Sequence, residues 1–329
     1  MLMPAFRQLI GPVVVAIACA IHPLAQAQSA ASYPNHPIHF IVPYAPAGNA
    51  DIVARLLGRM LAATLKQQFV IDNRGGANGN IGAELAARAP ADGYTIMLGT
   101  NTHVNNVTMY ANPGYDLEKD FAPVSLVSSA GAVMVVAPAL PVTSMKDFIA
   151  LARANRGRLL YGSGGSGSSG HLLAELFIMA AGIELTHVPY KGVAQALTDL
   201  AGGQVQVQFA STSSALPFMQ SGRLRALAIT TPARSALVPN VPTVSEAGLP
   251  GFDGSLWQCI LVPAHTPKDI ILKLNREIVS VLTTSEARDQ FLNQGVDAMT
   301  STPEELGKYM HSEIIKWAKV IRISGARAD

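Results

Sequence analysis

Nine consecutive glycines and serines, at residues 162–170, are the first feature of the sequence that could contact a ligand. Glycine lets a backbone approach a bound molecule closely, and serine hydroxyls donate hydrogen bonds to an acceptor-rich group. The alternative interpretation is a disordered linker, but this run joins a predicted strand to a predicted amphipathic helix, where linkers are rare. The candidate ligand contacts in the run are Ser163, Ser166, Gly167 and Ser168.

A second candidate loop, at residues 42–51, reads Val-Pro-Tyr-Ala-Pro-Ala-Gly-Asn-Ala-Asp and precedes a predicted helix. Its small residues leave the first backbone N–H groups of that helix uncovered, so these groups can point at an anion. The alternative is a tight structural turn in which Asn49 and Asp51 serve only as helix caps. The candidate contacts in this loop are Tyr44, Ala47, Gly48, Asn49 and Asp51.

A third candidate loop, at residues 187–192, reads His-Val-Pro-Tyr-Lys-Gly. Tyr190 and Lys191 stand at the start of a predicted helix, where they could hold an anionic group while the tyrosine closes over it. The alternative interpretation is that the lysine and the tyrosine are surface residues without a role in ligand binding. None of the three loops contains arginine, so we expect no bidentate guanidinium clamp on a carboxylate.

The same loops lack the motifs of common enzymes. No serine in residues 162–170 stands in a G-x-S-x-G nucleophile elbow, and there is no Walker A sequence. Residues 162–167 fit the dinucleotide fingerprint G-x-G-x-x-G, with Glu184 about 20 residues on, but any Gly/Ser-rich run produces this pattern readily. An exported hydrolase using serine and His171, and a dinucleotide-binding Rossmann protein, remain as alternatives. The histidines show no metal-binding spacing, so we expect neither a metal nor a cofactor.

The loops connect strands and helices that alternate along the chain. This βαβαβ order predicts an α/β fold with a mostly parallel sheet covered by helices on both faces, and the pattern then restarts as a second unit. The predicted strands are 38–43, 69–72, 94–99, 159–162, 186–188, 205–210 and 224–229, and the predicted helices are 51–69, 81–89, 144–155, 168–181 and 192–201, with two more that open near 266 and 302.

Two long extended runs, Val124–Ala137 and Trp257–Val262, could each pass between the two units. Two α/β lobes joined by two crossing segments form a hinged clamshell, in which ligands bind at the carboxyl ends of strands, against helix starts. We expect lobe 1 to contain residues 28–126 and 254–329, and lobe 2 to contain residues 127–253.

Three polar residues after a predicted strand belong to the same edge of this cleft. Asn101, Thr102 and His103 could set the length or shape of the ligand. Alternatively, these residues form a turn and cap a helix without contacting a ligand, and the sequence leaves both interpretations open.

Residues 1–27 are typical of a secretory signal peptide. Arg7 supplies a positive start, Leu9–Ile21 is a mostly apolar run too short to span a bilayer, and Ala25-Gln26-Ala27 is a cleavage-site pattern. A membrane anchor helix and a lipid anchor on Cys19 are the alternatives. Cleavage leaves Cys259 as the one cysteine, so we expect no internal disulfide.

Composition excludes further classes of function. The chain has 24 Lys+Arg against 22 Asp+Glu, a net charge of +2 that falls to +1 when Arg7 is removed. A near-neutral chain lacks the electrostatic footprint of a nucleic-acid-binding protein, and 49% hydrophobic residues exclude disorder. Capture of an anion must therefore be local, made by helix starts and hydroxyls.

Taken in order and spacing, several motifs resemble the receptors of tripartite tricarboxylate transporters, also called Bug receptors. They are VPYAPAGNAD (42–51), IDNRGGANGNIGAELAARAPADGYTIMLGT (71–100), YGSGGSGSSGHL (161–172), HVPYKG (187–192), SGRLRALAIT (221–230), VPTVSEAGLPGF (241–252) and TPKDIILKLNREI (266–278).

This resemblance implies a two-lobed periplasmic-binding-protein (Venus flytrap) fold and a periplasmic, monomeric solute receptor without enzymatic activity. It also implies a small carboxylate ligand in the cleft, a di- or tricarboxylate or an aromatic acid, held by the first loop and the Gly/Ser loop. The implied partners are two integral-membrane transporter subunits.

The chain departs from the pattern of this family in two places. Pro46-Ala47-Gly48 stands where the family usually has Pro-Gly-Gly, and Ala47 restricts φ in that loop. Ser211, a further candidate contact, follows Ala210 where an acid or amide is common in the family. Without that acid a ligand ammonium lacks a natural partner, so we expect an acid with no α-amino group.

Overall fold

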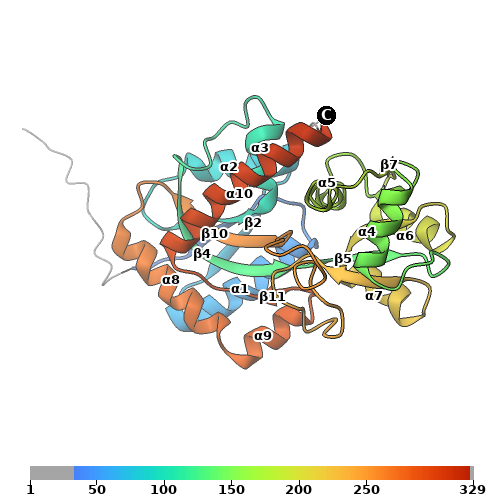
Figure 1. Cartoon of the computed structure of the whole chain (residues 1–329). Coiled ribbons are helices and arrows are strands. Elements are labelled where there is room, and N and C mark those ends of the chain that lie inside the picture. Colours follow the sequence, from blue (N-terminus) through green and yellow to red (C-terminus); the bar gives the residue numbers. More distant parts are fainter. Residues whose placement is uncertain (1–32, 327–329) are drawn as a thin grey trace, which may run out of the picture.

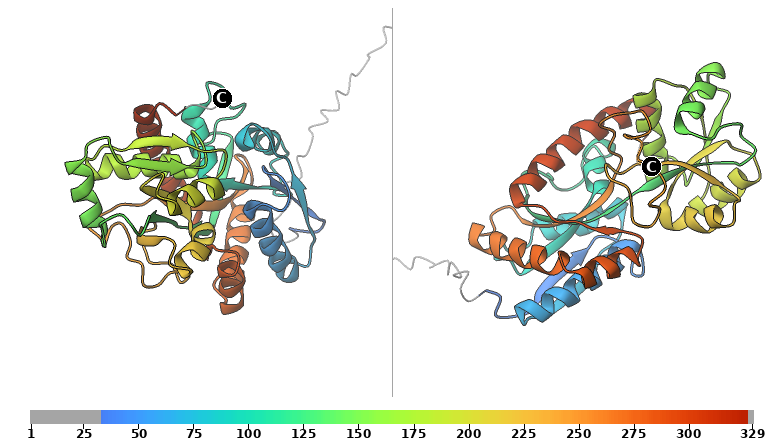
Figure 2. Two further views of the ribbon diagram at one scale, coloured as in Figure 1. Left: turned by 90° about the vertical axis from the view of Figure 1, so that its right-hand side faces the viewer. Right: turned by 60° about the horizontal axis from the view of Figure 1, so that its bottom comes forward.

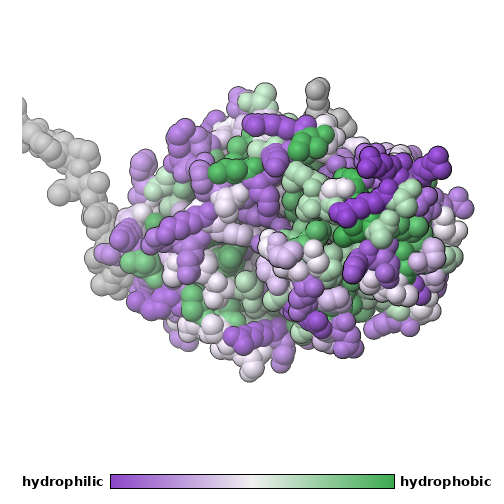
Figure 3. Space-filling model, in the orientation of Figure 1, coloured by the Kyte–Doolittle hydropathy of each residue, from purple (hydrophilic) through white to green (hydrophobic). Residues whose placement is uncertain are grey.

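The computed structural model describes residues 33–326, which form two lobes, each built on one sheet (Figure 1). The predicted signal peptide lies outside the described residues. In the described part of the chain, no helix is long and apolar enough to cross a membrane. On the face shown in Figure 3, hydrophilic residues are spread over both lobes, with hydrophobic residues in small groups between them.

The sheet of the first lobe has six strands among the described residues. Their order is β11 (Asp297–Ala298), β4 (Phe121–Ala130), β10 (Leu256–Pro263), β3 (Thr95–Thr100), β1 (Ile38–Val42) and β2 (Phe69–Asn73). One face carries α1 (Asn49–Leu65), α8 (Lys268–Leu282) and α9 (Ser285–Leu292), and the other carries η1 (Ala77–Gly79), α2 (Asn80–Ala87), α3 (Asn101–Met109) and α10 (Pro303–Ser324).

The sheet of the second lobe has five strands in the described chain. Their order is β7 (Thr186–Pro189), β6 (Leu160–Ser163), β8 (Val207–Ser211), β5 (Ala132–Val136) and β9 (Arg225–Ile229). One face is covered by α4 (Met145–Ala154) and α5 (Ser169–Ala181), and the other by α6 (Val193–Ala201) and α7 (Thr212–Gln220).

The predicted two-lobed α/β fold is confirmed, but the sheets are mixed rather than mostly parallel. β1 pairs in parallel with β2 and β3, whereas β10 runs antiparallel to both β3 and β4. In the second lobe, β6 is parallel to β7 and β8, while β5 is antiparallel to β8 and β9. The antiparallel pairs involve β4, β5, β9 and β10, the strands on either side of the two crossings between the lobes. The chain enters the second lobe along β5 and leaves it along β9, so these two strands run in opposite directions, as do β4 and β10 in the first lobe.

Local capping chemistry fixes the start of two predicted helices. Ser144 and Asp147 form a complete capping box at the start of α4, and Thr302 and Glu305 form another at the start of α10. Each box satisfies backbone N–H groups that a helix start leaves without intrahelical partners. α10 then runs along the first lobe and packs against α5 of the second (Figure 2).

The long run predicted at 124–137 is two strands that belong to different sheets and meet at Gly131. A Cβ atom on Gly131 would lie 2.5 Å from the side chain of Ile229, so only glycine fits at this crossing. Thr230 ties the two crossings together, because its Oγ1 accepts from the Ala132 backbone N–H at 3.0 Å and donates to the Gly254 carbonyl at 3.1 Å. These contacts make the hinge a defined structure rather than a loose linker.

Candidate ligand-binding cleft

A cavity of about 380 Å³ lies between the lobes, at the carboxyl ends of β1, β3 and β8. Among the residues that the structure describes, the lining contains no Asp, Glu, Lys, Arg or His. The lining residues are Tyr44, Gly48, Asn49, Ala50, Thr100, Asn101, Thr102, Ser128, Ala130, Gly131, Ser211, Ser213, Leu256, Trp257, Gln258, Gly295 and Val296.

Three helices begin at this cavity, α1 and α3 from the first lobe and α7 from the second. Gly48 and Ser211, the residues before α1 and α7, provide no side-chain cap to those helices. First-turn N–H groups and the helix dipole favour an anion at such a position. The cavity is therefore suited to an anionic group without any cationic side chain.

The loop before α1 is held in shape by Asp51, which does not line the cavity. Its buried carboxylate accepts from the Ala47 backbone N–H at 2.9 Å and from Arg55 Nε at 3.0 Å. Burial opposes ionisation, but the hydrogen bonds from Arg55 and Ala47 outweigh it and lower the pKa of Asp51. Ala47 has a φ of 66°, a left-handed conformation that its bond to Asp51 supports. Ala47 and Asp51 thus shape the loop, while Gly48 and Asn49 face the cavity.

Asn49 is oriented by residues from three other segments. Its Oδ1 accepts from Gln258 Nε2 at 3.0 Å, and its Nδ2 donates to the Gln294 carbonyl at 3.5 Å. Gln258 in turn accepts from Ser128 Oγ at 3.2 Å. Gln258 and Ser128 also line the cavity, although neither was a sequence candidate, so a polar wall links β4, β10 and α1.

Tyr44, Thr100 and His103 form a second polar chain that runs from the cavity lining into the first lobe. Tyr44 Oη and Thr100 Oγ1 are 2.6 Å apart, and the Thr100 backbone N–H donates to His103 Nδ1 at 3.0 Å. His103 is fully buried, and this burial lowers its pKa to about 4. His103 therefore completes the capping box of α3, while Asn101 and Thr102 line the cavity.

The family model described as tripartite tricarboxylate transporter family receptor matches residues 53–325 of the chain. The chain belongs to this receptor family. It is 37% identical over 316 residues to Protein BugT of Bordetella pertussis, covering 95% of this chain and 97% of that protein.

Solved structures similar to this receptor include both liganded and unliganded proteins. R. palustris Rpa4515 with adipate is 36% identical with a TM-score of 0.71, covering 90% of this chain and 99% of that one. MatC from Rhodopseudomonas palustris with bound malate is 30% identical with a TM-score of 0.66, covering 88% and 100%. A TctC solute-binding protein from Polaromonas without ligand is 26% identical with a TM-score of 0.80, covering 88% and 99%.

The remaining sequence candidates of the receptor lie outside the cavity lining. Ser163, Ser166, Gly167 and Ser168 form the loop before α5, and Tyr190 and Lys191 precede α6. Ser163 is fully buried, and its Oγ is 2.7 Å from His187 Nε2. Ser168 Oγ caps α5 by accepting from the His171 backbone N–H at 3.3 Å. In this conformation the second lobe contributes to the cavity through Ser211 and Ser213.

Trp257 connects the cleft of the receptor to its core. This residue lines the cavity from β10, and its Nε1 donates to Glu313 Oε2 at 3.1 Å. Trp317 donates to the same oxygen at 2.9 Å, and Lys316 pairs with the other oxygen of the carboxylate. Glu313 is only 2% exposed, so these three donors compensate for the burial of its charge.

Proposed function

We propose that the receptor binds a small carboxylate, a di- or tricarboxylate or an aromatic acid, in the interlobe cavity and presents it to a tripartite tricarboxylate-type transporter. The observation that carries this proposal is the meeting of three helix starts at a cavity that no charged side chain lines within residues 33–326. Backbone N–H groups and hydroxyls there can bind a carboxylate, and no acidic side chain repels it. Similar receptors have been solved with adipate and malate.

The ligand contacts that we propose come from both lobes. Tyr44, Gly48, Asn49, Asn101, Thr102 and Ser211 line the cavity as it stands. We further propose that closure of the lobes brings Ser166, Gly167, Ser168, Tyr190 and Lys191 toward the ligand. The structure resembles a relative solved without ligand at a TM-score of 0.80.

The cavity favours an acid without an α-amino group. An ammonium group that leaves water needs an anionic or strongly accepting partner, and the lining holds neither Asp nor Glu. Ser211 occupies the position from which an acid could have supplied this partner. We therefore expect malate or adipate to bind more tightly than aspartate or glutamate.

Calorimetric titration tests this proposal directly. The purified receptor is titrated with adipate, malate, citrate, benzoate, aspartate and glutamate, and small-angle scattering of the best complex measures the radius of gyration. We expect binding of at least one acid that lacks an amino group, accompanied by compaction. Tight binding of aspartate with no response to any other acid contradicts the proposed ligand class, and binding without compaction contradicts closure.

A hydrolase is not supported by the geometry of the serines. Ser163 is buried behind its own loop, and the Oγ atom of Ser168 serves as a helix cap. His171 Nδ1 accepts a backbone N–H group and does not activate a serine. We infer a periplasmic, monomeric receptor that binds without turnover and works with two integral-membrane subunits.

A further inference from the structure

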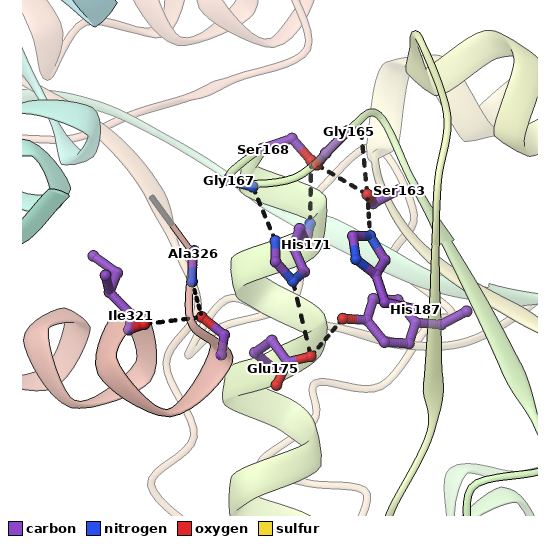
Figure 4. A network of polar contacts seen from close by, with 11 residues as sticks. Ser163, Gly165, Gly167, Ser168, His171, Glu175, His187, Ile321 and Ala326 are labelled. Carbon is purple, nitrogen blue, oxygen red and sulfur yellow. Dashed lines mark hydrogen bonds and ion pairs between the residues drawn. The ribbon is translucent and has the colours of Figure 1, made fainter. Parts of the chain in front are cut away.

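Two stacked histidines lie directly behind the Gly/Ser loop of the second lobe (Figure 4). His171 comes from the first turn of α5 and His187 from β7. Their ring centroids are 4.0 Å apart and their planes differ by 4°. Tyr161 of β6 extends the stack, with its centroid 4.7 Å from that of His187.

Each histidine holds a different part of the loop. The Gly167 backbone N–H donates to His171 Nδ1 at 2.9 Å. His187 Nε2 is bonded to Ser163 Oγ at 2.7 Å, and the same hydroxyl contacts both the N–H and the carbonyl of Gly165. The pair therefore fixes the loop at its beginning and at its end, with Ser166 between the two attachments.

The contact at Gly167 requires His171 to be neutral. A backbone N–H can only donate, so Nδ1 must carry a lone pair rather than a proton. Desolvation by burial lowers the pKa of His171, and it lowers the pKa of His187 to about 4. Both rings are thus neutral at neutral pH, and the loop keeps both attachments.

A charged side chain of α5 adjoins the pair. Glu175 of α5 lies with Oε1 3.9 Å from His171 Nε2 and accepts from Tyr161 Oη at 2.5 Å. Figure 4 labels Ile321 of α10 and Ala326, which follows that helix, beside this network, and neither side chain titrates. The Glu175 carboxylate lies on the Nε2 side of the His171 ring, and Nδ1 faces the loop.

We propose that His171 is a positioning residue, whose neutral ring sets the conformation in which the Gly/Ser loop meets the ligand. His187 supports it by holding Ser163. This inference rests on the proposed function, because the loop matters for binding only if closure brings it to the ligand. His171 itself touches no ligand in this arrangement.

Two nearly isosteric variants isolate the acceptor. His171→Asn places an amide oxygen close to the position of Nδ1, whereas His171→Leu has the same shape without an acceptor. Both lose the stacking on His187, so the comparison between them reports on the acceptor for the Gly167 N–H. Amide hydrogen exchange of Gly167, followed by NMR on the full mature chain without ligand, is the readout.

We expect Gly167 to exchange about tenfold faster in His171→Leu than in wild type, and at nearly the wild-type rate in His171→Asn. The wild type should also lose protection at Gly167 as the pH falls below the ordinary range of histidine, whereas His171→Asn should not. Equal protection in all three proteins, or a wild type without this pH dependence, overturns the proposal. The pH series on the wild type requires no variant to fold.

Titration with adipate and malate separates this inference from the proposed function. If the wild type binds an acid, we expect weaker binding in His171→Leu and recovery in His171→Asn. A wild type that binds none of the panel overturns the proposed function while the exchange result still decides the role of His171. Loss of protection without any loss of affinity overturns the link between the loop and the ligand.

Discussion

Gly295 and Ser213 face each other across the cleft, where the two lobes touch. Gly295 belongs to the turn between α9 and β11 in the first lobe, and Ser213 to the first turn of α7 in the second. A Cβ atom on Gly295 would lie 3.2 Å from Ser213 Cβ, and Gly295 has a φ of +79°. Both residues line the cavity, so closure must proceed around this contact.

Gly295→Ala should weaken ligand binding by about tenfold, because the added methyl group opposes the approach of the lobes. Gly203→Ala is the matched control, since Gly203 has the same φ of +79° with nothing within 4 Å of an added Cβ. Both variants should lose about 1 kcal/mol of unfolding free energy from backbone strain. Calorimetry and thermal unfolding measure the two effects, and an equal loss of affinity in both variants would falsify the role of the contact.

Ligand binding should change the tryptophan fluorescence through Trp257 alone. The chain has two tryptophans, and of these Trp257 lines the cavity while Trp317 does not. Titration of the wild type, Trp257→Phe and Trp317→Phe with the tightest acid of the calorimetric panel checks this. The change should persist in Trp317→Phe and disappear in Trp257→Phe; the reverse pattern would place the ligand elsewhere.

Glu313→Leu should lower the unfolding free energy by about 3 kcal/mol, because two buried indole N–H groups and Lys316 lose their shared acceptor. Urea denaturation followed by circular dichroism measures this loss. Glu304→Gln is the control, because the exposed pair of Glu304 with Lys308 should contribute nothing measurable. Similar midpoints for the two variants would contradict a structural role of Glu313.

Asp51→Asn should destabilise the receptor by about 1–2 kcal/mol at pH 7, since the loop before α1 loses its charged acceptor. The pKa of Asp51 in the folded state is lowered from 3.8, so its stabilising effect is complete above that value. The effect disappears as the pH falls below 3.8 and through the lowered pKa. Unfolding midpoints from pH 7 to pH 2.5 should therefore converge for wild type and variant, and a constant difference would exclude this carboxylate as the cause.

Much of the fold follows from local sequence patterns. The strand and helix alternation, the Ser144 and Thr302 caps and the two crossing segments depend on periodicity and on contacts within a few residues, which a sequence displays directly. Three helices, α3, α7 and α9, were not predicted. α3 is rich in polar residues and α7 contains Pro217, so neither has a clear apolar stripe, and packing decides them.

Local patterns in the sequence are therefore sufficient to predict the two-lobed α/β class and the loops that start the helices. The tertiary structure alone decided that β5 and β10 run antiparallel to their neighbours and that Trp257 and Gln258 reach the cavity. It also decided that Gly295 meets Ser213 and that His103 is buried. These facts depend on residues far apart in the chain, whose pairing is set by the packing of whole elements and leaves no local pattern.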